Sequence, residues 1–282
     1  MTVAWRSAWQ VVFIAWAGVA GTADAQILSA NPVNYHALVH TLKLGDRLQL
    51  AAGDYMNGLP VHHLSSLPQL PIVIAGMGAP ERAVFHARSG ANTVSIVDSA
   101  YVEIRDLVFQ GYNLQIKHQT GRASVPGMPV TARQTIIRHN VFNKAQNTSS
   151  GQLTRPNVLV GHRPLAGNGA DIRYQIYANF FYYNPIEALF QGKGNIALYN
   201  NIFVNPATDA VHIQPHHGIP RNIVIAYNTS VASGDGVRLL HRLDTPVADM
   251  AFTHNLIFAD RTVAGLTDAG NLAQDYAGPR RK

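Results

Sequence analysis

A six-residue pattern of apolar and polar positions recurs along the chain. In each copy an aliphatic or aromatic residue is followed by two variable residues, an asparagine, one further residue and, in most copies, an apolar residue. An earlier copy, at residues 104–109, has Leu107 in place of the asparagine. Neighbouring copies are 22 to 39 residues apart, which is typical of a solenoid with variable insertions. The asparagines of the five full copies are Asn140, Asn179, Asn201, Asn228 and Asn255.

Short runs rich in Val, Ile, Phe and Tyr flank each copy. Their polar and apolar positions alternate, and Asn, Gly, Asp or Pro separate them, so each repeat is expected to contain several short strands joined by turns. No stretch has a sustained helical period, which disfavours helical repeats. With about three strands per turn, every strand can pair in parallel with its equivalents one coil away, about 4.8 Å above and below. The pattern therefore predicts an all-β parallel β-helix.

The recurrent asparagine is expected at a tight bend between two strands. Such a bend leaves backbone groups that no sheet satisfies. Asparagine tolerates the left-handed conformation, and its amide can bond to the backbone and to the asparagine one coil away. We therefore predict an internal Asn ladder. The alternative is that the five asparagines only mark surface turns, but the apolar residues on both sides of them favour the ladder.

The repeated pattern and its flanking strands resemble the right-handed parallel β-helix superfamily. This superfamily contains the pectate lyases and the chondroitinase B and alginate lyase group. The resemblance covers residues 27 to about 260 and includes the opening segments Leu42–Leu50, Gly53–Tyr55, Pro71–Ile74 and Tyr101–Phe109. It implies a single-stranded right-handed parallel β-helix. We expect a short helix within Pro32–Leu44 to cap its N-terminal end, because such a cap prevents edge-to-edge association.

For the chondroitinase B group, the resemblance implies a lysine base on one coil and, on the next coil, an arginine followed by His-Gly. Aligning the coils on Asn195 and Asn222 places Gln191 at the lysine position and His216 at the arginine position. Lys193 is displaced by two residues from the lysine position. The catalytic pair of that group is therefore not preserved, and its specific activity is not transferred to this chain.

Composition narrows the possible chemistry. The chain has 282 residues, of which 47% are hydrophobic and 13% charged, as in a folded protein. It has no cysteine, which excludes disulfides, thiolate catalysis and Cys-based metal sites. The net charge of +6 includes three charges at Arg280, Arg281 and Lys282, so the remainder is too weakly basic for a dedicated nucleic-acid binder. The 13 histidines add positive charge in mild acid, which suits an acidic polysaccharide.

Residues 1–25 have the pattern of an export signal. Arg6 precedes an apolar run at Val11–Gly21, and Ala23-Asp-Ala25 provides a cleavage site after Ala25. The apolar run is much shorter than the ~20 residues that span a bilayer. We expect an exported bacterial protein, periplasmic or extracellular, with a β-helix at residues 26–262 and an irregular or partly disordered tail at 263–282. We expect a monomer with no membrane span after signal cleavage.

One side of the predicted β-helix collects histidine and arginine residues. Aligning the strands that follow the asparagine turns gives inward aliphatic columns, with Ile186 and Val211 among them, and two outward rows. Glu187, His212 and Arg238 would be neighbours in the first row at a spacing of about 4.8 Å. The first row is Gln115, Leu159, Glu187, His212 and Arg238; the second is Gln119, Arg163, Gln191, His216 and Arg242; His162, His217 and His241 fall on the same side.

This set of side chains suggests a polysaccharide lyase that cleaves a uronic-acid polymer by β-elimination. The reaction needs a group that neutralises the uronate, a base for the C5 proton and an acid for the leaving oxygen. We assign neutralisation to Arg238 with Arg242, the base to His212 or His216, and orientation of the imidazole to Glu187. The expected substrate-binding residues are Arg242, His241, His217, Lys117, His162, Arg163 and Gln191.

Other interpretations remain open from the sequence. The same side chains could serve only as contacts in a non-catalytic glycan-binding or envelope-associated β-helix, or they could be ordinary exposed charges. A glycoside hydrolase is disfavoured, because it uses two facing carboxylates and the row offers only Glu187. We expect no metal cofactor. If an ion binds, calcium suits the nearest carboxylates, Glu187, Asp209 and Asp235, better than zinc.

Overall fold

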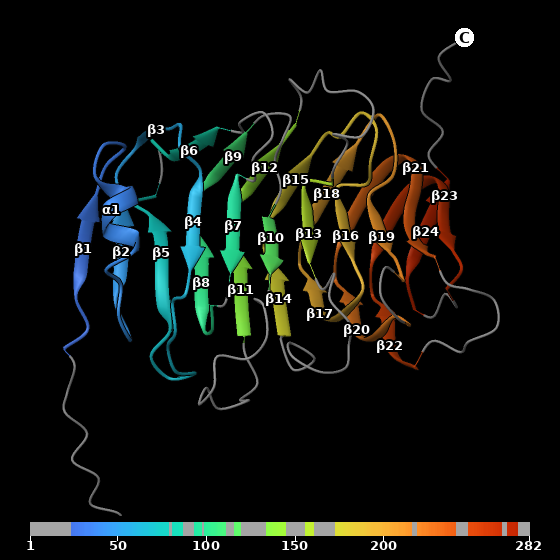
Figure 1. Cartoon of the computed structure of the whole chain (residues 1–282). Coiled ribbons are helices and arrows are strands. Elements are labelled where there is room, and N and C mark those ends of the chain that lie inside the picture. Colours follow the sequence, from blue (N-terminus) through green and yellow to red (C-terminus); the bar gives the residue numbers. More distant parts are fainter. Residues whose placement is uncertain are drawn as a thin grey trace, which may run out of the picture.

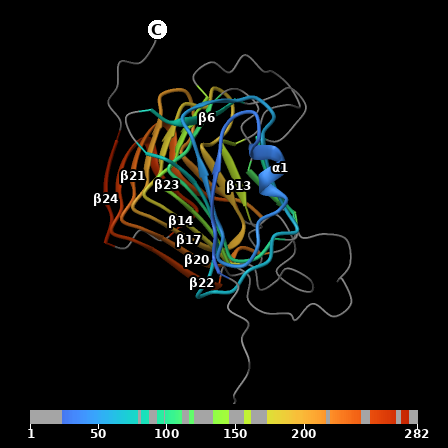
Figure 2. The same cartoon turned by 90° about the vertical axis from the view of Figure 1, so that its left-hand side faces the viewer.

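In most coils the chain forms three short strands, one on each of three faces (Figures 1 and 2). The described residues contain no helix that is long and apolar enough to cross a membrane. The computed structural model describes residues 24–78, 81–86, 93–97, 99–110, 116–119, 134–144, 156–160, 173–215, 219–240, 248–266 and 270–275.

The first face is a nine-stranded parallel sheet. Strands that are far apart in the sequence lie side by side in it, because the chain returns to this face once per coil. In order, its strands are β1 (Ile27–Ala30), β2 (Arg47–Leu50), β5 (Ile72–Gly76), β8 (Val102–Arg105), β11 (Gln134–Arg138), β14 (Arg173–Tyr177), β17 (Gly194–Tyr199), β20 (Arg221–Ala226) and β22 (Ala248–Thr253).

The second and third faces belong to one larger sheet, because the long strand β21 (Thr229–Leu239) continues from one face to the other. The second face comprises β3 (Gly53–Tyr55), β6 (Ala83–His86), β9 (Val108–Gln110), β12 (Val141–Asn143), β15 (Phe180–Tyr182), β18 (Ile202–Asn205), the first parts of β21 and of β23 (Leu256–Ala264), and β24 (Leu272–Asp275). The third comprises β4 (Leu59–His62), β7 (Val94–Val97), β10 (Ile116–Gln119), β13 (Val158–Val160), β16 (Phe190–Gly192), β19 (Val211–Ile213) and the second parts of β21 and β23. All pairs of strands are parallel, so the predicted fold class is confirmed.

The core lies between the three faces and consists of equivalent side chains stacked coil upon coil. On the second face, consecutive coils contribute an aromatic ring at the same inward position, and the ring centroids are 4.6 to 5.7 Å apart. Each ring is fully buried, and burial of such a side chain contributes roughly 1.5–3 kcal/mol. The stacked rings are Phe85, Phe109, Phe142, Phe181 and Phe203.

The five asparagines form a continuous ladder at the corner between the first and second faces. Asn201 shows the pattern. Its Oδ1 accepts hydrogen bonds from the backbone N–H and the Nδ2 of Asn179, at 3.1 and 3.0 Å. Its Nδ2 donates to the Oδ1 of Asn228 at 3.0 Å and to two carbonyls, those of Ile176 and Tyr199. The amides thus satisfy backbone groups at the bend and also join neighbouring coils.

The left-handed residue at each bend is the one before the ladder position, and not the asparagine itself as expected. Its φ lies between 52° and 60° in the six coils from Asp106, which precedes Leu107, to His254. In this position the preceding residue reverses the chain while the asparagine amide remains directed into the corner. The six residues are Asp106, His139, Ala178, Asn200, Tyr227 and His254.

The β-helix extends beyond the predicted boundary at residue 262. Strand β24 pairs in parallel with β23, and the ladder gains Asn271, whose Oδ1 accepts from the Nδ2 of Asn255 at 2.8 Å. Gly270 adopts the left-handed conformation before this asparagine, with a φ of 72°. Asn271 is only 16 residues after Asn255, which is less than the shortest interval in the repeat. In the described residues, β24 follows β23 without a first-face strand between them, which shortens this last coil.

A single short helix, α1 (Tyr35–Val39), lies at the N-terminal end of the β-helix (Figure 1). It is shorter than the predicted segment Pro32–Leu44. Tyr35 and Val39 are buried, and the Tyr35 hydroxyl donates to the carbonyl of Gly58 at 2.7 Å. The Tyr35 ring also packs edge-on against Tyr55, with 4.9 Å between centroids. The helix therefore covers the end of the core.

Four histidines lie close together near this cap, and we expect the folded protein to lose stability in mild acid because of them. Burial lowers the pKa of His62 below its usual value, and His63, His40 and His36 lower it further. The unfolded chain then binds the proton more readily than the folded chain. The contribution of neutral His62 to the free energy of unfolding is complete above the ordinary histidine pKa of about 6.5. It declines as the pH falls towards the lower pKa of the folded state. Between about pH 7.5 and 5.5, Tm should fall less in His62→Gln than in the wild type. Parallel pH profiles of the two proteins would contradict this.

Candidate functional site

A row of outward positions on the third face brings together part of the predicted site. The paired strands place Gln191 beside His212, and His212 beside Arg238. Towards the N-terminus, Gln191 pairs with Leu159, and Leu159 pairs with Lys117.

Two members of the predicted first row are wrong: Gln191 occupies the place assigned to Glu187, and Lys117 that assigned to Gln115. The error at Glu187 comes from the turn before β16. Asn184 Oδ1 accepts hydrogen bonds from the backbone N–H groups of Ile186 and Glu187, which keeps these residues in the turn. As a result β16 starts only at Phe190, and Ile186, predicted to be inward, is 45% exposed.

Most of the other predicted site residues, including the alternative base His216, fall outside the described residues. This applies to His162, Arg163, His216, His217, His241 and Arg242. Lys117 and Gln119 are described only through the backbone pairing of β10 with β7 and β13. The described part of the site is therefore centred on Gln191, His212 and Arg238.

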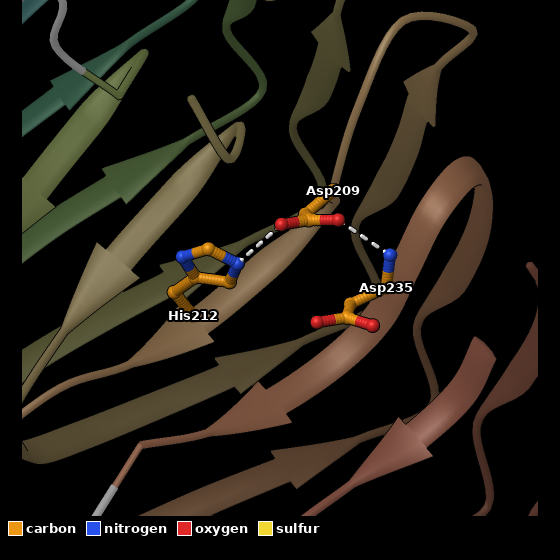
Figure 3. Close-up of side chains that lie close together, drawn as sticks. All are labelled: Asp209, His212 and Asp235. Carbon is orange, nitrogen blue, oxygen red and sulfur yellow. Dashed lines mark hydrogen bonds and ion pairs between the residues drawn. The ribbon is translucent and has the colours of Figure 1, made fainter. Parts of the chain in front are cut away.

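His212 is held by a carboxylate three residues earlier, just before β19 (Figure 3). Its Nε2 is 2.7 Å from Oδ2 of Asp209, and its Nδ1 is 3.3 Å from Nε2 of Gln214. A neutral imidazole that donates from Nε2 to Asp209 has its lone pair on Nδ1. Only 10% of the His212 side chain is exposed, so the ring orientation is well defined.

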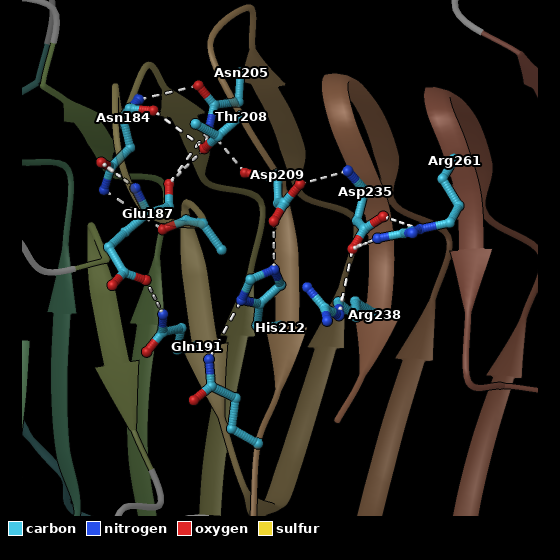
Figure 4. Close-up of polar contacts among 12 residues, drawn as sticks. Asn184, Glu187, Gln191, Asn205, Thr208, Asp209, His212, Asp235, Arg238 and Arg261 are labelled. Atoms are coloured by element: carbon cyan, nitrogen blue, oxygen red, sulfur yellow. Dashed lines mark hydrogen bonds and ion pairs between the residues drawn. The ribbon is translucent and has the colours of Figure 1, made fainter. Parts of the chain in front are cut away.

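Asp209, and not Glu187, orients the imidazole. The Glu187 carboxylate instead accepts a hydrogen bond from Nε2 of Gln191, at 2.5 Å (Figure 4). The predicted role of Glu187 is therefore corrected: the structure assigns that role to a residue three positions before His212. Asp235 stands three positions before Arg238 in the same way. This repeated offset, Asp-Ala-Val-His and Asp-Gly-Val-Arg, is the sequence signal that could have identified both aspartates.

The Asp209 carboxylate is fixed from several sides. Its Oδ1 accepts a hydrogen bond from the backbone N–H of Asp235. The backbone carbonyl of Asp209 accepts one from Nδ2 of Asn205 at 2.8 Å. Gly234 leaves space for the carboxylate, since a Cβ there would lie 2.1 Å from Asp209 Oδ1. Burial alone would raise the pKa of Asp209. The hydrogen bonds from His212 and from the Asp235 N–H, with the charges of His212 and Arg238, outweigh burial and lower it. Asp209 therefore stays ionised beside the imidazole.

A second asparagine ladder positions the turns that carry Glu187 and Asp209. Asn184 Nδ2 donates to Asn157 Oδ1, and the Asn184 backbone N–H donates to Asn205 Oδ1, both at 3.1 Å. These three asparagines are fully or almost fully buried at the corner between the second and third faces. The members of this ladder do not belong to the six-residue pattern, so the repeat does not predict them.

Arg238 lies beside a buried carboxylate that also binds a second arginine. Its Nε is 3.5 Å from Oδ2 of Asp235, and Arg261 contacts both oxygens of the same carboxylate, with Nη2 at 2.7 Å from Oδ2 (Figure 4). The Asp235 side chain is 2% exposed, whereas that of Arg238 is 38% exposed. Two guanidinium groups thus share one buried carboxylate, and the charge of Asp209 balances the second guanidinium next to His212.

Asp209, His212 and Asp235 also have the spacing of potential metal ligands, with ligand atoms within 4.8 Å of one another. Their other contacts disfavour a cation. Both oxygens of Asp235 contact Arg261, and Asp209 bonds to His212 and to a backbone N–H. A metal ion would have to replace these bonds and approach Arg238. The described contacts favour an ion-pair network over a calcium site.

Lys193, set aside in the sequence comparison, follows β16 directly at the corner between the third and first faces. Its side chain is fully buried, and burial, followed by the nearby charge of Arg221, lowers its pKa. A lysine of this kind gives up its proton more readily than an exposed one, so Lys193 is a second candidate base.

No protein-family model matches the chain, and no curated protein matches it. Among solved structures, an alginate lyase from Paenibacillus sp. str. FPU-7 matches with a TM-score of 0.40 and 15% identity, over 88% of this chain and 98% of that one. A mannuronic acid specific polysaccharide family 6 lyase from human gut microbiota matches with a TM-score of 0.31 and 15% identity, over 88% of this chain and 82% of that one. The assignment of the fold rests on the strand pairing described above.

Proposed function

We propose that the protein is an exported bacterial polysaccharide lyase that cleaves a uronic-acid-containing polysaccharide by β-elimination. The observation that carries the proposal is the pairing of His212, which Asp209 orients, with Arg238 at the same register of the next strand. An oriented imidazole beside a partly exposed guanidinium combines a proton acceptor with a binding group for a carboxylate. Both lie on an outward row of the third face.

In the proposed reaction, His212 removes the proton from C5 of the uronate. The Nδ1 atom accepts this proton, and the long contact with Gln214 gives way to the substrate. The electron pair of the C5–H bond forms the C4–C5 double bond, and the bond from C4 to O4 breaks. O4 takes up a proton from water, which in turn receives the proton from the imidazolium of His212. Asp209 stabilises the imidazolium that forms, because its carboxylate remains ionised.

Arg238 neutralises the uronate carboxylate in this scheme. Adjacent strands are about 4.8 Å apart, so a sugar bound across β19 and β21 can contact both residues. Neutralisation makes the C5 proton more acidic and stabilises the charge that develops on the carboxylate. A hydrolytic mechanism has less support, because Glu187, Asp209 and Asp235 are each already hydrogen-bonded or ion-paired within the protein.

The direct test is incubation of the purified protein with alginate, pectate, glucuronan and glycosaminoglycans while the absorbance of the unsaturated product is recorded. A lyase produces that absorbance with at least one polymer. If no polymer is cleaved but retention on polyanions weakens with salt and with each Arg or His removed, the protein is a glycan-binding β-helix and the lyase proposal fails.

Replacing Arg238 by lysine should reduce kcat even though the charge is retained. Lysine lacks the planar pair of donors that matches a carboxylate, so it binds the uronate less specifically in the transition state. We expect a loss of roughly tenfold or more. Arg173→Lys is the matched control, because Arg173 is exposed at the start of β14 on the first face. Equal activities of the two variants would rule out this role for Arg238.

A further inference from the structure

The outer surface of the second face carries a row of apolar side chains that follows the axis of the β-helix. The paired strands place five such residues and one threonine, Thr229, directly above one another over six consecutive strands. Figure 1 shows these strands following one another along the molecule. Phe180 and Ile202 are 37% and 47% exposed. The row is Val108, Val141, Phe180, Ile202, Thr229 and Leu256, and it continues to Leu272 on β24, which is 69% exposed.

A second row lies beside the first, two residues further along each strand. It becomes apolar towards the C-terminal end and includes two aromatic rings. Its members are Gln110, Asn143, Tyr182, Val204, Val231 and Phe258. We call these two rows, with Leu272, the apolar face.

None of the side chains of the apolar face is charged. The other faces differ: Glu103, Arg105 and Arg138 point outward from the first face and form ion pairs, and Arg238 lies on the third. Soluble proteins rarely expose such a surface without a partner. Depletion of charge together with enrichment in aromatic residues is typical of the buried centre of a protein–protein interface.

We propose that the apolar face binds the same face of a second copy of this chain, forming a two-fold symmetric dimer. This proposal differs from the monomer expected from the sequence. A second copy fits because an uncharged surface meets itself without opposing like charges, whereas a chain with a net charge of +6 would repel its copy elsewhere. The two sheets would pack face to face about 10 Å apart, as in a β-sandwich.

The apolar face can be compared with what a stable dimer requires. It has 13 side chains, and each partner in a standard interface contributes about 20–30 residues. The residues around the face therefore have to supply the rest of the contact. This proposal is independent of the proposed lyase activity, because His212 and Arg238 lie on the third face.

The test is the mass of the full chain in solution, measured by light scattering after gel filtration at up to about 100 µM, where an interface of this size should be populated. We expect twice the mass of one chain. Ile202→Lys should give a folded monomer with unchanged circular dichroism, because the side chain points outward. Val224→Lys is the matched control: Val224 is 43% exposed on the first face, and this variant should stay dimeric.

Cross-linking gives a second measurement, because the chain contains no cysteine. A short bismaleimide should join two copies of the Ile202→Cys variant and leave Val224→Cys as single chains. A wild-type monomer at about 100 µM, or a dimer that survives Ile202→Lys, would overturn the proposal. If the monomer binds lipid vesicles and Ile202→Lys abolishes this binding, the apolar face belongs to a membrane contact and the dimer is rejected.

Discussion

The His212→Ala variant should form unsaturated product at least ~10²-fold more slowly than the wild type, which is the usual contribution of a positioned general base. The loss should appear in kcat with little change in KM, because the imidazole acts on the proton in transfer and adds little to ground-state binding. Asp209→Asn should also lower kcat, since an amide no longer stabilises the imidazolium. Initial rates over a range of substrate concentrations separate these effects.

The matched control is His36→Ala, which removes an exposed histidine from α1 at the N-terminal end and should leave the rate unchanged. A wild-type rate in His212→Ala would reject the assignment of the base. If the rate is retained in His212→Ala and lost in Lys193→Met, the base is the buried lysine. Loss only in the His212→Ala, His216→Ala double variant would instead show that either imidazole can act.

Replacing Asn201 by alanine should destabilise the protein by about 3 kcal/mol. The substitution removes the acceptor for the buried N–H of Asn179 and the donor to two carbonyls, those of Ile176 and Tyr199. Each buried donor or acceptor left without a partner costs about 1–3 kcal/mol. Urea denaturation followed by circular dichroism measures the change.

Asn57→Ala serves as the control for this measurement, because Asn57 is exposed and should change the stability by less than about 0.5 kcal/mol. An equally small effect of Asn201→Ala would mean that water or a backbone shift satisfies the freed groups. The ladder would then contribute little to stability.

The fold could be predicted from the sequence because a solenoid repeats the same physical requirement in every coil. Asn140, Asn179 and Asn201 identify the bend even though the loops between them vary in length. The left-handed residue could not be predicted, because His139, Ala178 and Tyr227 share no chemical type. The preceding residue needs only to tolerate the conformation, whereas the asparagine has to supply specific donors and acceptors.

The candidate site was less predictable, because it depends on turns that lie outside the repeated pattern. Alignment by sequence assigned Ile186 and Glu187 to a strand, whereas hydrogen bonds to Asn184 hold them in a turn. From the sequence, Asp209 and Asp235 are expected only as possible calcium ligands. Their actual partners, His212 and Arg238, follow three residues later, across a bend that periodicity does not resolve.

The Asn ladder has a direction. From Asn140 to Asn271, each Nδ2 donates to the Oδ1 of the next coil towards the C-terminus, so the amide dipoles all point the same way and add along the axis. Each bond polarises the next, which couples the coils electrostatically as well as through packing. A further coil can extend this array only in the same orientation. Growth of the β-helix by duplication of a coil preserves the polarity, whereas two molecules joined end to end would continue it only head to tail.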